Sequence, residues 1–178
     1  MNPFVSNLRD VGLTINQLAG ENLLKTGVIY RGGKIEDIPN LDSIHSPKVI
    51  VNLRKATDPI YEGVLSIHAP APDSVEVYDI SQGRNKKWIS ETLGAMFKPE
   101  IRIPIYIHCA LGKDRTGIMT AALITLLEIP ENLILEDYLL SKGTLQPELI
   151  QKAIKDLQDR HLYRKLNTEK IKAQLLEG

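Results

Sequence analysis

The sequence predicts an α/β fold with a central, mainly parallel sheet of four to five strands, flanked by helices, and a helical C-terminal third. Short β-branched runs alternate with helical patterns up to residue 128, and only helical patterns follow. This alternation is typical of parallel sheets, because a helix carries the chain back to the start of the next strand. A length of 178 residues and a hydrophobic fraction of 43% suit a single domain over residues 1–178.

Four segments are predicted as strands, because they are short apolar runs bounded by turn-forming residues. They are residues 28–30, 48–53, 65–69 and 101–108. The second and fourth are the richest in β-branched residues. Pro104 lies near the start of the fourth strand, where a missing N–H group is tolerated.

Five segments carry helical patterns: residues 85–97, 114–128, 131–141, 145–159 and 168–177. The segment 114–128 is apolar almost all round, which indicates a helix buried within the domain. It must end near Pro130, because the residue before a proline avoids the helical conformation. A weaker helical pattern over 34–45 is interrupted by Pro39.

The composition excludes several classes of partner. Lys plus Arg is 22 and Asp plus Glu is 22, so no overall positive field attracts nucleic acid, and we expect no nucleic-acid partner. The only cysteine cannot form an internal disulfide, which is typical of a reducing compartment. The N-terminus lacks a signal-peptide pattern, and the longest apolar run, 118–127, is shorter than the ~20 residues of a membrane span. We therefore expect a cytoplasmic protein without an integral membrane segment, of undetermined oligomeric state.

That cysteine, Cys109, lies between the fourth strand and the buried helix, in the segment HCALGKDRTG (108–117). Backbone N–H groups of such a loop and of the first helical turn form an anion site, and they lower the pKa of a thiol placed there. Gly112 permits a positive φ or a close backbone approach. Arg115 offers a planar fork for two phosphate oxygens, and Thr116 offers a hydroxyl to the sulfur. These groups predict attack of a thiolate on phosphorus, followed by hydrolysis of the thiophosphate by water.

This segment resembles the signature loop of the cysteine-dependent protein tyrosine phosphatase superfamily, in which Cys, five residues and Arg form the phosphate-binding loop. Its ending is similar to compact bacterial members of the dual-specificity and tyrosine/lipid phosphatase type. More loosely, SNLRDVG (6–12) and GVIYRGGKI (27–35) resemble their N-F-R-D-L-G-G and Y-R-S-G segments. VIVNLR (49–54) resembles their I-D-L-R strand, with Asn52 where Asp is usual. The likeness covers roughly residues 6–140, and no Trp-Pro-Asp triplet is present.

The resemblance implies a single phosphatase catalytic domain with a phosphatase-like three-layer sandwich. It implies hydrolysis of phosphate monoesters through a cysteinyl-phosphate, with Cys109 as nucleophile and Arg115 as phosphate ligand. His108 would orient the loop and tune the thiolate. The substrate-binding residues would be Ala110, Leu111, Gly112, Lys113, Asp114, Arg115 and Thr116.

The substrate class stays open at this point. The expected partner is a phosphorylated protein, or a phosphoinositide or inositol phosphate. In lipid-acting relatives a lysine near this position helps to hold further phosphates, which favours such a role for Lys113. The alternative is a solvated charge pair with Asp114 at the helix start.

A general acid must protonate the leaving oxygen, and in compact phosphatases it is an Asp on a loop about thirty residues before the Cys. Asp73 directly follows the third strand in a Pro-Ala-Pro-Asp setting, whereas Asp79 has the better spacing. We favour Asp73, with Asp79 second and Asp114 third. Each is also a residue type common in ordinary turns.

Other chemistries fit less well. A nucleotide P-loop requires Ser or Thr after its Lys, where this chain has Asp114. The four histidines and the lone cysteine have no metal-ligand spacing, so we expect neither metal nor cofactor. Two alternatives remain: a rhodanese-type sulfurtransferase, whose loop is usually one residue shorter, and a catalytically silent phosphate-binding module, which normally lacks the Cys or the Arg.

Overall fold

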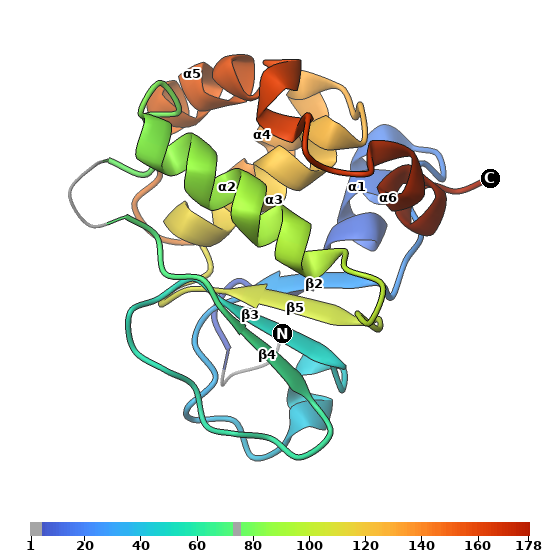
Figure 1. The fold of residues 1–178 in the computed structure, drawn as a ribbon, viewed down its shortest axis with the longest axis vertical. Helices are drawn as coiled ribbons and strands as arrows, with labels where there is room; N and C mark the ends of the chain where they lie inside the picture. Colours follow the sequence, from blue (N-terminus) through green and yellow to red (C-terminus); the bar gives the residue numbers. More distant parts are fainter. Residues whose placement is uncertain (1–4, 73–75) are drawn as a thin grey trace.

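A five-stranded sheet organises the protein in the computed structural model, which describes residues 5–72 and 76–178. The strand order is β1-β2-β5-β3-β4 (Figure 1). The strands are β1 (Arg9–Asp10), β2 (Ile29–Gly32), β3 (Val49–Asn52), β4 (Leu65–His68) and β5 (Ile105–His108). All neighbouring strands pair in parallel except β1, which is antiparallel to β2. The predicted mainly parallel α/β fold is confirmed.

Six α-helices complete the described chain. They are α1 (Val11–Ala19), α2 (Gly83–Met96), α3 (Asp114–Leu126), α4 (Glu131–Leu139), α5 (Pro147–Leu157) and α6 (Thr168–Leu175). Two 3-10 helices, η1 (Leu41–Ile44) and η2 (Arg160–Tyr163), lie in the connections. Among the described residues, no helix has the length and apolar character needed to cross a bilayer.

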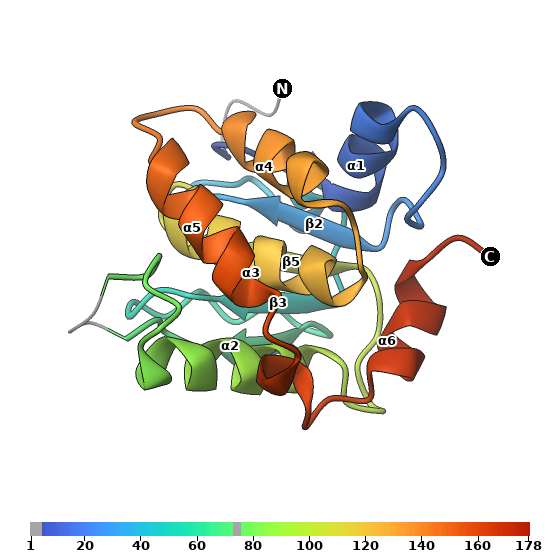
Figure 2. The same cartoon turned by 90° about the horizontal axis from the view of Figure 1, so that it is seen from above.

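The two faces of the sheet are covered differently. Val51 and Ile107 belong to the main core, which lies under the helices. On this face α3 lies against the sheet and α5 lies outside α3 (Figures 1 and 2). Side chains of Ile50 and Tyr106 point the opposite way, into a smaller core that includes Ile44 of η1. The layer on this second face therefore consists of loops and η1.

β1 and α1 were not predicted from the sequence. The α1 segment contains Gly12 and several β-branched residues, which are weak helix formers. Capping groups at both ends stabilise the helix despite this weak propensity. The Asp10 carboxylate caps the N-terminus by accepting from the N–H of Leu13, and Gly20 ends the helix with a φ of 74°.

Two predicted elements are shorter than expected. The strand predicted over 101–108 begins only at Ile105, and the carbonyl of Pro104 accepts hydrogen bonds from the N–H groups of Lys48 and Val49. Within 34–45 only the single turn of η1 is helical. The predicted helices from residue 85 onward are present, with ends shifted by a few residues.

The register of the sheet fixes where the site lies. β5 runs between β2 and β3, and its last residue, His108, is level with Gly32 and Asn52 at the carboxyl ends of those strands. In an open parallel sheet, this edge is where ligands bind. The chain then passes through Cys109 directly into α3.

Candidate active site

The Cys109 thiol lies at the bottom of the loop between β5 and α3, and its residue is only 2% exposed. Burial by itself raises the pKa of this thiol. Interactions with the hydroxyl and backbone N–H of Thr116 and with the N–H of Lys113, together with the charge of Arg115, outweigh that effect, and the pKa is lowered. The buried Thr116 hydroxyl has no hydrogen-bond partner of regular geometry in the described part of the chain, which leaves it available to the sulfur. The arrangement therefore favours a thiolate.

Gly112 turns the loop through a conformation that only glycine adopts readily, with a φ of 67°. A Cβ atom here would lie 2.3 Å from the carbonyl carbon of Gly32 and 2.7 Å from the nitrogen of Gly33. The loop is thus packed directly against the backbone at the end of β2. Any side chain at residue 112 would force the two segments apart.

A buried cluster of Arg9, Arg31 and Asp137 supports the loop between β5 and α3. Arg31 on β2 donates to the carbonyl of Gly112 (3.1 Å) and forms a 2.6 Å ion pair with Asp137 of α4. Arg9 on β1 binds the other carboxylate oxygen of Asp137 at 2.9 Å. Burial alone would raise the pKa of Asp137, but the two guanidinium groups lower it. The ionised carboxylate fixes Arg31 beneath the loop.

The two upstream segments noted in the sequence also contact the loop. The Leu111 carbonyl accepts hydrogen bonds from the side chains of Ser6 (3.1 Å) and Asn7 (2.8 Å). The Ala110 carbonyl accepts from the N–H of Lys34 at 3.0 Å. Because these carbonyl groups are bonded to residues outside the loop, the N–H groups of the loop are left to face an anion.

Lys113 and Asp114 both have partners within the chain. Lys113 is 8% exposed, and its Nζ donates to the Thr144 carbonyl and lies 3.5 Å from the Asp114 carboxylate. The Asp114 carboxylate also accepts from the Tyr78 hydroxyl at 2.5 Å, and that hydroxyl lies 2.7 Å from the hydroxyl of Tyr138. These contacts join the loop to the segment before α2 and to α4.

A pocket of about 420 Å³ opens in front of Arg115. Within residues 5–72 and 76–178, no hydrogen bond or ion pair engages the Arg115 guanidinium, so it is available to an anion. Both polar and apolar side chains line the pocket: Lys55, Ala71, Pro72, Glu76, Val77, Tyr78, Asp114, Arg115, Gln146 and Leu149. Asp73 lies outside the described residues, but the described residues on either side of it, Pro72 and Glu76, belong to this lining.

Asp79, the second candidate for the general acid, lies just before the start of α2. It does not line the Arg115 pocket, and its carboxylate accepts from the hydroxyl of Ser81 (2.5 Å) and the side chain of Gln82 (3.0 Å) at the start of α2. The hydrogen bond from Ser81 is the main reason why the pKa of Asp79 is lowered. This carboxylate stabilises a turn in its ionised form.

Two acidic residues at the site, Glu76 and Asp58, were not predicted from the sequence. Glu76 lines the pocket, and it stands three residues beyond Asp73. Asp58 lies fifty residues before His108 in sequence, yet its Oδ2 is 2.7 Å from His108 Nε2. The position of Asp58 in the sequence could have indicated this contact, because Asp58 follows the carboxyl end of β3 and β3 is adjacent to β5 in the sheet.

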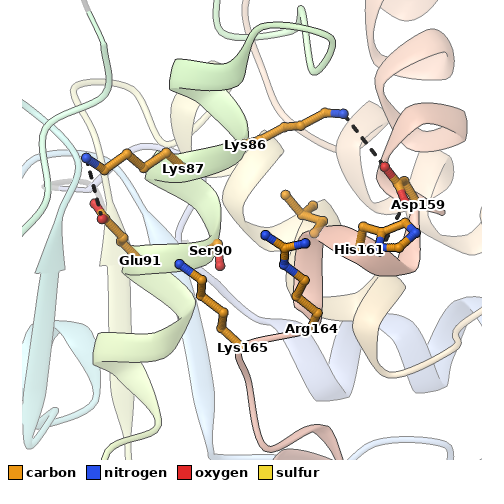
Figure 3. A pocket seen from close by; sticks show the side chains of 9 residues that line it. Lys86, Lys87, Ser90, Glu91, Asp159, His161, Arg164 and Lys165 are labelled. Carbon is orange, nitrogen blue, oxygen red and sulfur yellow. Dashed lines mark hydrogen bonds and ion pairs between the residues drawn. The ribbon is translucent and has the colours of Figure 1, made fainter.

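A second pocket, of about 350 Å³, lies between α2 and η2 (Figure 3). Charged pairs border it, Lys86 with Asp159 at 3.7 Å and Lys87 with Glu91 at 3.9 Å. It contains none of the loop residues 108–117. In the described part of the chain, no group of three or more His, Cys, Asp or Glu side chains is arranged to hold a metal ion.

Comparisons with known proteins bear on the fold and on the family of the chain. A search of curated proteins finds no significant match. Among solved structures, the fold is similar to the core catalytic domain of the PP-IP phosphatase SIW14 from S. cerevisiae, solved in complex with citrate. The TM-score is 0.63 at 20% identity, over 87% of this chain and 96% of that one. OH1 from the Orf virus, a tyrosine phosphatase, matches with a TM-score of 0.48 at 14% identity, over 79% of this chain and 87% of that one.

The family itself is shown by sequence. A model described as the tyrosine phosphatase family matches residues 3–176, a span that includes the loop and every segment that anchors it. The predicted cysteine-dependent phosphatase is thereby confirmed at the level of the family: the chain belongs to the tyrosine phosphatase family.

Proposed function

We propose that this phosphatase hydrolyses phosphate monoesters through a covalent intermediate on Cys109. The observation that carries the proposal is the buried thiol of lowered pKa at the start of α3, beside Arg115, whose guanidinium has no hydrogen-bond or ion-pair partner among the described residues. The Cys109 thiolate attacks phosphorus while the bond to the leaving oxygen breaks. Arg115 and the loop N–H groups hold the three other phosphate oxygens, over which the negative charge of the transition state is spread.

The leaving oxygen takes a proton from a carboxylic acid in the same step. In the second step, water attacks phosphorus, its proton passes to that carboxylate, and the S–P bond breaks to regenerate the thiolate. We propose Asp73 as this acid, because the flanking Pro72 and Glu76 line the Arg115 pocket. Asp79 is less suited, since the hydrogen bonds that lower its pKa favour the form without a proton.

The remaining loop residues support the phosphate rather than react with it. We propose that Ala110, Leu111 and Gly112 act through their backbone N–H groups. Thr116 donates to the sulfur, which stabilises the thiolate as it leaves phosphorus. Lys113 and Asp114 shape the loop, since each already binds a group of this chain.

We propose phosphotyrosine-type aryl phosphates as the first substrate class. The apolar side chains of Val77 and Leu149 offer contacts for an aromatic ring beside Arg115. A second candidate is an inositol phosphate, because Lys55 adds a cationic side chain to the same lining. SIW14, whose fold is similar, is a PP-IP phosphatase, which agrees with this second class.

The test is phosphate release from an aryl phosphate by wild type and by Cys109→Ser. We expect turnover that vanadate blocks and that Cys109→Ser abolishes, with acid quenching trapping a phosphocysteine only in wild type. A silent binding module would bind phosphate and release none. A rhodanese-type sulfurtransferase would instead consume thiosulfate, and either outcome contradicts the proposal.

A further inference from the structure

His108, the residue before Cys109, is fully buried, and its two ring nitrogens have partners within the protein. Nε2 lies 2.7 Å from Oδ2 of Asp58, and Nδ1 lies 3.4 Å from the carbonyl oxygen of Cys109. The ring stacks on Tyr106 with a centroid distance of 5.5 Å and an interplanar angle of 16°. The orientation of the ring is therefore fixed from three sides.

Asp58 is itself held in place. Its side chain is 3% exposed, and its second oxygen, Oδ1, accepts from Nη2 of Arg54 at 2.9 Å. Arg54 Nη1 binds Glu36, whose side chain is 34% exposed. Burial alone would raise the pKa of Asp58, but His108 and Arg54 lower it. This ionised carboxylate can only accept hydrogen bonds, so Nε2 of His108 carries a proton.

The second ring nitrogen lies against the backbone of the proposed nucleophile. Nδ1 is 3.4 Å from the carbonyl oxygen of Cys109, a longer contact than the 2.7 Å between Nε2 and Asp58. The Asp58 carboxylate is therefore the closer polar anchor of the ring, and a change at Asp58 is transmitted through the ring to the Cys109 backbone.

We propose that Asp58 is a positioning residue for this phosphatase: it fixes the His108 ring behind the Cys109 backbone and so keeps the loop N–H groups aligned on the Cys109 sulfur. The inference rests on the proposed function for its catalytic meaning, but the state of the thiol can be measured without turnover. Nothing in the loop motif itself specifies this carboxylate.

Several other charged or titratable groups lie near Cys109, His108 and Asp58. Arg31 lies on the neighbouring strand β2, and its charge interacts with Cys109. Tyr61 is near Asp58, and His68 of β4 binds the carbonyl of Arg54 at 2.8 Å. Arg115 acts on the thiol from the pocket side. Among these groups, Asp58 is the carboxylate in direct contact with His108.

The experiment measures the rate of Cys109 alkylation by iodoacetamide against pH in the full chain. Asp58→Asn keeps the size of the side chain and removes its charge. We expect its alkylation midpoint to lie about one pH unit higher than in wild type, so that alkylation is about tenfold slower below both midpoints. The matched control is Asp37→Asn, because Asp37 pairs with Lys34 at the surface (3.3 Å) and should leave the midpoint unchanged.

An unchanged midpoint in folded Asp58→Asn overturns the inference. If that variant does not fold, nitrogen-15 NMR of the wild-type imidazole decides. A His108 ring with a proton on Nε2, shared with the Asp58 carboxylate, supports the inference, and a ring with Nε2 unprotonated overturns it. Failure of the proposed function has a different result, namely a normal alkylation profile in a protein that releases no phosphate from any monoester.

Discussion

The hydroxyl of Tyr78 donates a 2.5 Å hydrogen bond to Oδ1 of Asp114, which joins the segment before α2 to the first residue of α3. Tyr78 is 4% exposed and lies in the stretch that leads from the proposed acid to α2. The same hydroxyl contacts Tyr138 of α4, whose own hydroxyl accepts from the N–H of Gln146. Burial, followed by the bond to Asp114, raises the pKa of Tyr78, so the phenol stays a donor.

Tyr78→Phe should therefore reduce both stability and turnover. The variant leaves the Asp114 and Tyr138 oxygens without this partner, which costs about 1–3 kcal/mol in the free energy of unfolding. We also expect a several-fold fall in kcat/KM, because the acid segment and the loop lose their direct bond. Urea unfolding and aryl phosphate kinetics measure the two effects. Tyr163→Phe is the control: it removes a 2.9 Å bond to the Leu157 carbonyl far from the loop and should affect stability alone.

The general acid is tested with leaving groups of different basicity. Asp73→Asn should lower kcat for phosphotyrosine by about 10²–10⁴-fold and flatten the high-pH limb of the rate profile. Activated aryl phosphates, whose leaving groups need no proton, should be affected less. Asp79→Asn should keep the wild-type profile. A normal rate in Asp73→Asn, with the loss seen instead in Glu76→Gln or Asp79→Asn, would assign the acid to that other residue.

Gly112→Ala tests the close approach of the loop to β2. The Cβ atom would meet the Gly32 backbone at 2.3 Å, and the φ of 67° adds strain of about 1–2 kcal/mol. We expect a loss of at least about 10²-fold in kcat/KM, because loop displacement misplaces the phosphate. Gly63→Ala is matched in backbone strain, with a φ of 73° but open space around its Cβ. It should cost stability only, and equal activities in the two variants would contradict the packing argument.

Two lysines near the pocket should behave differently in a substrate panel. Lys113→Ala removes a side chain that binds the Thr144 carbonyl, so kcat/KM should fall by a similar factor for phosphotyrosine peptides, phosphothreonine peptides and inositol phosphates. Lys55→Ala changes the pocket lining and should weaken inositol phosphates most. If Lys113→Ala impairs only the polyphosphorylated substrates, then Lys113 contacts the additional phosphate itself.

Acid should weaken the cluster below the loop. Burial opposes ionisation of Asp137, but Arg31 and Arg9 outweigh it, and the folded-state pKa of this carboxyl is lowered. Its stabilising contribution is therefore complete above the unfolded-state value of about 3.9 and is lost as the pH falls through the lower folded value. Asp137→Asn leaves Arg31 buried without its counter-ion and should cost about 3–5 kcal/mol at pH 7. Urea unfolding between pH 2 and 7 should show a flatter pH dependence in the variant.

Local patterns were sufficient to predict much of this protein. β-Branched runs indicated β2, β3, β4 and β5, and the motif around Cys109 indicated a strand, loop and helix that the structure contains. The α1 helix escaped because its caps and tertiary packing, rather than propensity, stabilise it. The partners of the loop escaped for a different reason. Asp58 and Asp137 are ordinary residues of a loop and a helix until the strand order brings them next to His108 and Arg31.

The ion pairs of Asp137 join parts of the chain that are synthesised far apart in time. Asp137 follows Arg31 by 106 residues and Arg9 by 128, and the complete loop motif precedes it in the chain. During synthesis, the nascent chain exposes Cys109 and Arg115 before the carboxylate that fixes Arg31 has been added. Arg31, which binds the Gly112 carbonyl, therefore gains its counter-ion only after this long-range closure. The final shape of the loop thus depends on a part of the chain that is made after the loop itself.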